Sequence, residues 1–193
     1  MTNLPYHVDS YYPPHVGGAE RRRTAEVASK RMAAQGWRLQ PVTVEGVHIA
    51  KGVWGKAWCD NIDAWQEHAS RLANGRGYLR DGAVINLRIE GGMVTALVQG
   101  TKLYHVGVDI KPLPPAKRAR LKDLSTAGPG SPELAALLLP SSKELKMRCD
   151  CPDWSGLCKH LAAALYGIGV RLDGQPELLL ALRGVDPDEL SQP

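Results

Sequence analysis

The sequence of 193 residues contains no phenylalanine and only four cysteines. It has no apolar run near the ~18 residues that a membrane-spanning helix needs. Its first 18 residues, MTNLPYHVDSYYPPHVGG, lack the apolar core of a secretion signal. We therefore expect a cytoplasmic protein without a membrane partner, in a compartment where thiols stay reduced.

Two common catalytic patterns are also missing. The sequence has no G-x-x-x-x-G-K-[ST] phosphate-binding loop. No histidine is followed two places later by glutamate, as the zinc deaminases require. Cys59 has no histidine near it in the sequence, and we expect it to be a packed thiol. These observations favour a protein that is not an enzyme, so that any ATPase would be a partner.

Composition and patterning predict an α+β fold. Hydrophobic residues make up 44% of the chain, enough for a core, while 14 prolines and 20 glycines indicate short elements with many turns. Residues 83–110 contain three β-rich runs, separated by Gly91-Gly92 and by a second reversal at 99–102, which predicts an antiparallel meander. An amphipathic helix that packs on this meander is predicted from one apolar stripe, formed by Trp58, Ile62, Trp65, Ala69 and Leu72.

The remaining segments divide the chain around this unit. We expect a tail with a basic helix over residues 1–36 and the α+β domain over 37–110, with two short strands in 37–52 and a helix that ends at Asn74-Gly75. Residues 111–142 read as a linker with a short helix capped by Ser131-Pro132. A small ββα zinc finger over 143–172 and an acidic, Leu-rich helix over 173–193 complete the prediction.

Three of the four cysteines lie in the stretch CDCPDWSGLCKH, at positions 149–160. Cys149 and Cys151 share one face if the chain is a strand there, and Cys158 and His160 fall at the start of the following helix. Three cysteines and one histidine form a common closed ligand set for tetrahedral zinc. A disulfide would need an oxidising compartment, and three unrelated buried cysteines would not need this spacing. The cluster therefore predicts one structural zinc ion.

The spacing C-x-C-x(6)-C-x-H resembles the signature of the SWIM zinc finger. The likeness includes CDCPDWSGLCKHLAAALYGIG and four further stretches of bacterial SWIM zinc-finger proteins, VEGVHIAKGVWGKAWCDNID, RLANGRGYLRDGAV, VTALVQGTKLYHVGV and LLLALRGVDPDEL. It implies that Cys149, Cys151, Cys158 and His160 bind zinc. It also implies a DNA-binding or protein-interaction module that is linked with Snf-type DNA-translocating ATPases.

Charge placement gives the candidate contacts. The net charge of +4 is compatible with nucleic acid as a partner, DNA before RNA. Six basic residues near the finger and the Gly-rich turn are candidates to contact phosphates, and Trp154 to stack on a base: Lys143, Lys146, Arg148, Lys159, Arg76 and Arg80. The alternative is a protein adaptor, in which the finger and the C-terminal helix dock a partner through Leu178, Leu179 and Leu182. For each candidate an ordinary role, a solvated charge or a packed side chain, stays open.

Overall fold

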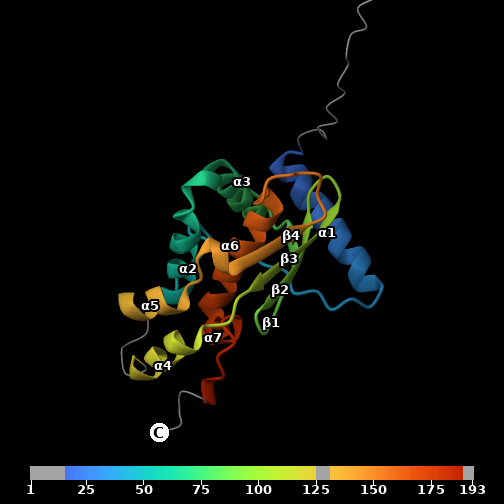
Figure 1. The fold of residues 1–193 in the computed structure, drawn as a ribbon. Helices are drawn as coiled ribbons and strands as arrows, with labels where there is room; N and C mark the ends of the chain where they lie inside the picture. The colour runs from blue at the N-terminus through green and yellow to red at the C-terminus, as the bar shows by residue number, and fades with distance from the viewer. Residues whose placement is uncertain (1–15, 125–130, 189–193) are drawn as a thin grey trace, which may run out of the picture.

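A computed structural model describes residues 16–124 and 131–188 (Figure 1). Four strands form one antiparallel sheet in the order β1-β2-β3-β4, and helices flank it, which confirms the α+β class. The strands are β1 (Val84–Glu90), β2 (Met93–Gln99), β3 (Leu103–Ile110) and β4 (Leu145–Cys149). The helices are α1 (Gly18–Ala34), α2 (Val53–Asp63), α3 (Ala69–Arg80), α4 (Pro115–Asp123), α5 (Pro132–Leu138), α6 (Lys159–Gly174) and α7 (Leu178–Leu182), with 3-10 turns η1 (Gln66–His68) and η2 (Ser142–Glu144).

The meander forms as the sequence predicts. β1 and β2 are joined at Gly91, whose φ of 57° suits glycine, and Gly100 hydrogen-bonds to the carbonyl of Lys102 in the second reversal. Alternate residues point to opposite faces, so that Val94, Ala96 and Val98 enter the core from β2. The predicted basic helix α1, the short helix α5 and the strand β4 are also present.

Helix α6 lies at the centre of the fold. It packs on one face of the sheet and contacts both α2 and α3, so that eleven of its sixteen residues are buried. Leu161, Leu165 and Ile168 are buried, and so are the residues between them. The finger and the meander therefore share one hydrophobic core.

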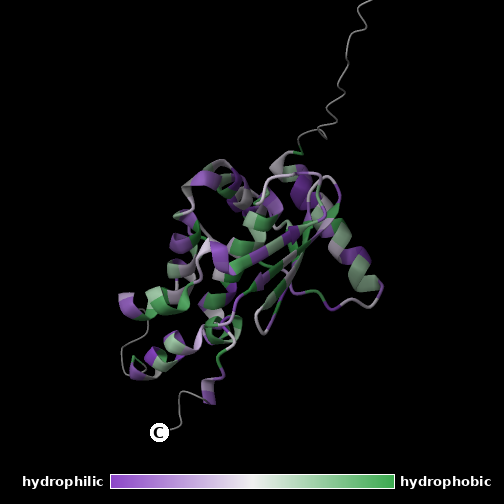
Figure 2. Cartoon of the chain, viewed as in Figure 1, coloured by the Kyte–Doolittle hydropathy of each residue, from purple (hydrophilic) through white to green (hydrophobic). Residues whose placement is uncertain are grey.

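Helix α1 covers part of the opposite face of the sheet. Ala25 and Met32 pack there against Ile85 and Leu97 in a second, smaller cluster. Figure 2 shows hydrophobic residues along the strands and α6, and hydrophilic residues recurring along α1 and α4.

The single amphipathic helix predicted from the stripe between Trp58 and Leu72 is wrong, because the structure has two helices there. Helix α2 ends at Asp63. Helix α3 begins at Ala69 and runs through Asn74-Gly75, where we expected the predicted helix to end. Asp63 sits at this corner and accepts hydrogen bonds from Arg76 of α3 and Tyr166 of α6. Gly75 is a close-approach position, because a Cβ there would lie 2.4 Å from the Cβ of Ala162. The glycine that suggested a helix end in fact lets α3 cross α6.

Two further expectations are corrected. Residues 37–52 contain no strand, although the amide of Val42 and the carbonyl of Gln40 both hydrogen-bond to β1. The amide of Gln40 donates to the side chain of Asn86 rather than to the backbone, and the β1–β2 register has a bulge between Val84 and Asn86, so the backbone hydrogen bonds do not continue as a ladder. In the finger, residues 150–157 form bends rather than a second strand, and its single strand, β4, pairs with β3 of the meander. The expected ββα zinc finger therefore consists of the fourth strand and the central helix of the main fold, joined by bends.

Candidate metal centre

The four predicted ligands come together at one end of the sheet. Cys149 is the last residue of β4, Cys151 follows it, Cys158 is the N-cap of α6, and His160 lies in the first turn of that helix. Their ligand atoms all lie within 4.8 Å of one another. The end of β4, the bend that follows it and the start of α6 bring together the four ligands that the sequence predicted.

The donor set fits zinc. Tetrahedral zinc bound at about 2.3 Å to sulfur and about 2.0 Å to nitrogen separates these donors by about 3.6 Å. The Nδ1 atom of His160 lies 3.9 Å from the Sγ atoms of both Cys149 and Cys158. Small movements would bring all four ligands to a single ion, and the four together would complete a closed tetrahedral shell.

The electrostatics at the start of α6 favour a thiolate. The hydrogen bond from the Cys149 thiol lowers the pKa of Cys158 to about 4, against the opposing effect of burial, and His160 adds to this stabilisation. The same interaction raises the pKa of Cys149. The amide of Leu161 also donates to Cys158 Sγ at 3.4 Å. The thiolate of Cys158 is favoured by its position at the N-terminus of α6, and the thiolate is the form of cysteine that binds zinc.

Aromatic rings from distant parts of the chain clamp His160. The ring of Tyr104 stacks on the imidazole with centroids 4.2 Å apart, and Tyr78 meets it edge-on at 5.3 Å. His160 Nε2 is buried without a hydrogen-bond partner among the described residues, and it faces Gly100 so closely that a Cβ there would lie 2.8 Å away. Sequence reasoning missed these three residues, because no local pattern marks a contact made across the fold.

The loop between the two ligand pairs has its own supports. Asp153 accepts hydrogen bonds from the amide and hydroxyl of Ser155 and forms an ion pair with Arg71 at 3.0 Å. These contacts lower the pKa of Asp153 despite its partial burial, which acts in the opposite direction. Trp154, the next residue, is 100% exposed. The expected alternative for this indole, packing over the finger, does not occur.

The other basic candidates lie apart from one another. Lys143, Lys146 and Arg148 are exposed along η2 and β4, and Arg148 is paired with Asp109 of β3. Arg76 faces the inside corner at Asp63 and Tyr166, and Arg80 donates to the carbonyl of Val47. Lys159 lies between the ligands Cys158 and His160 in the sequence, and its ammonium group is 5.5 Å from the centre of the Tyr78 ring.

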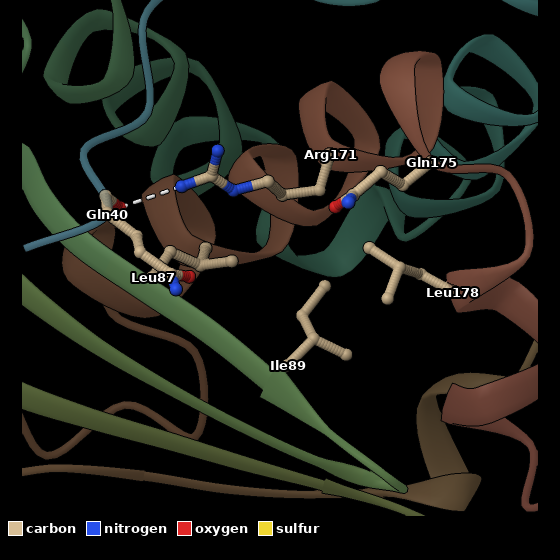
Figure 3. A pocket seen from close by; sticks show the side chains of 6 residues that line it. All are labelled: Gln40, Leu87, Ile89, Arg171, Gln175 and Leu178. Atoms are coloured by element: carbon tan, nitrogen blue, oxygen red, sulfur yellow. Dashed lines mark hydrogen bonds between the residues drawn. The ribbon is translucent and has the colours of Figure 1, made fainter.

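Two of the three partner candidates at the C-terminus are core residues. Leu179 and Leu182 are 1% and 0% exposed, because α7 packs on β1 and α6. Leu178 is half-buried and lines a hollow of about 230 Å³ with Leu87, Ile89 and Arg171 (Figure 3). The apolar run that suggested a docking surface therefore serves the chain's own core. Cys59 is also packed, and burial raises its pKa to about 12.

No helix in the described parts of the chain has both the length and the apolar character needed to cross a membrane.

Comparison with known proteins agrees with this geometry. The chain is 35% identical over 178 residues to the "Uncharacterized protein Rv2102" of Mycobacterium tuberculosis, an alignment that covers 78% of this chain. The chain spans only 64% of that relative's length. No solved structure matches. The family model of the SWIM zinc finger matches residues 135–167, which contain all four clustered ligands. This chain therefore contains a SWIM zinc finger, whose Cys₃His cluster fits a single structural zinc ion.

Proposed function

We propose that the zinc finger is a non-catalytic module that binds nucleic acid, DNA in the first place, within a larger assembly that includes a Snf-type DNA translocase. The observation that carries the proposal is Trp154, a fully exposed indole in the loop between the two pairs of ligands. An exposed indole is costly to present to water and is suited to stacking on a base. Because Trp154 lies between Cys151 and Cys158 in the sequence, the position of its indole should depend on bound zinc.

The ligand set supports a structural rather than a catalytic role for zinc. Catalytic zinc keeps a position open for water or substrate, usually beside three protein ligands. Here three thiols and one imidazole supply four donors within 4.8 Å of one another. Such a shell would hold the loop and leave no position for a reacting molecule.

An adaptor for a protein partner is the second candidate, and the same residue would serve it. Tryptophan is enriched among the residues that dominate protein interfaces. The burial of Leu179 and Leu182 removes the apolar surface on which this alternative mainly relied. The positive charges beside the loop, from Lys159 and Lys102, favour phosphate over an apolar protein face.

The test is binding of the full chain to fluorescent duplex DNA, single-stranded DNA and RNA of equal length, measured by anisotropy with and without a zinc chelator. We expect binding that weakens steeply with salt and that disappears with the metal. Absence of binding to all three at low salt would refute the proposal. Capture of the Snf-type partner by the full chain is a separate experiment.

A further inference from the structure

Cationic groups surround the zinc end of the molecule in a fixed arrangement. The start of α1, the β2–β3 turn and the loop between β4 and α6 lie together at this end (Figure 1). Tyr78 and Tyr104, which clamp His160, connect them. Lys159 lies over the Tyr78 ring, and Lys102 of the turn lies 5.7 Å from the centre of the Tyr104 ring. These contacts place both lysines beside the finger, although only Lys159 belongs to it.

Two of the acidic groups at this end are already paired, whereas Glu20 in the first turn of α1 is exposed. Asp153 is paired with Arg71, and Asp81 is shared by Arg21 at 2.7 Å and Arg22 at 3.6 Å. Among the described residues Lys102 and Lys159 form no ion pair, although the charge of Lys159 helps to lower the pKa of Asp153 against the opposing effect of burial. Arg22 keeps a side chain that is 56% exposed. Lys159, Lys102 and Arg22 therefore place positive charge around the zinc end, from the finger to α1, and Glu20 and the thiolate ligands offset part of it.

The outer face of β3 and β4 is different. Arg148 is paired there with Asp109, and His105 with Asp150 at 2.9 Å. Arg148 and Lys146 lower the pKa of Asp109, so this carboxylate stays charged and cancels part of their field. A strand edge with alternating charges is the usual protection against unwanted pairing and needs no ligand.

We infer that a single strand of nucleic acid crosses the zinc end, with Trp154 stacked on one base and Lys159, Lys102 and Arg22 on successive phosphates. This inference rests on the proposed function. It adds where the nucleic acid lies on the protein and that the nucleic acid is single-stranded. A base inside a duplex has its faces covered by its neighbours, whereas a single strand can offer a base to the indole. The path does not run along β4. It reaches the β2–β3 turn and α1, which lie outside the SWIM finger.

The experiment compares two pairs of neutralising substitutions in the full, zinc-loaded chain. The test pair is Lys102→Gln with Lys159→Gln, and the matched control pair is Lys143→Gln with Lys146→Gln on η2 and β4. The probes are oligo-dT, a duplex of equal length, and poly-glutamate, which has charge but no bases. Binding is followed by anisotropy across salt concentrations, and zinc content is measured for each variant. If Lys159→Gln, next to His160, lowers zinc content, Lys102→Gln alone is compared with Lys146→Gln.

We expect the test pair to lower the salt slope on oligo-dT by about 1.4, since each phosphate contact contributes about 0.7 on single strands. The control pair should leave the slope unchanged. Trp154→Ala should weaken oligo-dT binding by about 5- to 150-fold, as loss of one stacked base does, while Trp154→Phe retains most of it. Binding of the duplex should change little in either Trp154 variant.

Three results would overturn the inference. If the control pair lowers the slope and the test pair does not, nucleic acid binds along β4, and the proposed function stands without this path. If Trp154→Ala weakens poly-glutamate and oligo-dT binding equally, the surface takes an acidic protein segment. If the unsubstituted chain binds no nucleic acid, the proposed function itself fails, and the inference with it.

Discussion

Replacing Gly100 by alanine tests how the zinc site is held from outside the finger. Gly100 lies in the β2–β3 turn, and its φ is not among the positive values, so alanine meets no backbone penalty there. The only change is the added Cβ. It would lie 2.8 Å from His160 Nε2 and 2.8 Å from a ring carbon of Tyr104.

The size of the effect follows from these contacts. An ordinary contact of a Cβ starts at 3.4 Å, so one of the neighbours has to move by at least about 0.6 Å. The imidazole cannot swing sideways, because Tyr104 stacks on one face and Tyr78 meets its edge. The added Cβ would instead push the imidazole out of its position relative to the thiols. The distances between zinc and its ligands vary by only about 0.2 Å. Damage to the surroundings of a metal-binding histidine lowers affinity by about 10- to 100-fold. We expect a loss in that range for Gly100→Ala.

The measurement is zinc affinity by competition with a chromophoric chelator, with the visible spectrum of the cobalt-substituted protein as a second readout. The spectrum of Gly100→Ala should shift in intensity, since the histidine ligand no longer completes a regular tetrahedron. The control is Gly156→Ala, in the zinc loop itself, where a Cβ would have nothing within 4 Å. If both variants keep the affinity within twofold and the same spectrum, the clamp on His160 has no role in metal binding.

The other predictions concern the ligands, the core and pH. Cys151→Ser should lose zinc in elemental analysis and loosen residues 150–158 in hydrogen exchange, while α6 stays protected within the shared core. Trp65→Ala should lower the free energy of unfolding in urea by roughly 3–5 kcal/mol, as for other buried large aromatics, and a loss below about 1 kcal/mol would mean that the Trp65 pocket is not part of the core. Arg183 is fully buried and pairs with Glu144 at 2.6 Å, so Arg183→Met should destabilise the fold by about 3–5 kcal/mol in the same assay, and an unchanged urea midpoint would contradict the pairing. Burial acts to raise the pKa of Glu144, but hydrogen bonds from Ser141 and Arg183 outweigh it and lower this pKa from 4.5 to about 2. The contribution of Glu144 to stability should therefore be present above pH 4.5 and be lost as the pH falls towards 2. In urea melts across this pH range, Glu144→Gln should remove the dependence on pH.

The parts of the fold that the sequence predicted depend on local patterns. The meander was predicted from alternating apolar residues around Gly91-Gly92, and the zinc ligands from a two-residue spacing that suits a strand end and a helix start. The Ser131 cap is also local, since its side chain accepts a hydrogen bond from the amide of Leu134. In each case the atoms that interact are close in the sequence, and the residue type alone selects the geometry.

The features that the sequence did not show are set by packing. Gly75 looks like a helix end in one dimension, and only the position of Ala162 shows that it is a crossing point. The Leu-rich C-terminus looks like an unpartnered surface until α7 is seen against β1. The same holds for the zinc site. His160 is in close contact with Tyr78, Gly100 and Tyr104, which all lie more than fifty positions before it in the sequence. Contacts of this kind have no signature in one sequence.

The shared core changes what zinc contributes. A finger that folds alone owes its stability to the metal, because its own apolar core is too small. Here β4 is held by β3, and α6 is buried by α2, α3 and the sheet, so the elements that flank the ligands have support of their own. The segment that relies most on zinc is the loop from Asp150 to Leu157, which has no strand or helix. Trp154 lies in this loop and is fully exposed. Zinc therefore acts mainly on the position of the residue that carries the proposed function, and metal loss should reduce binding well before it unfolds the chain.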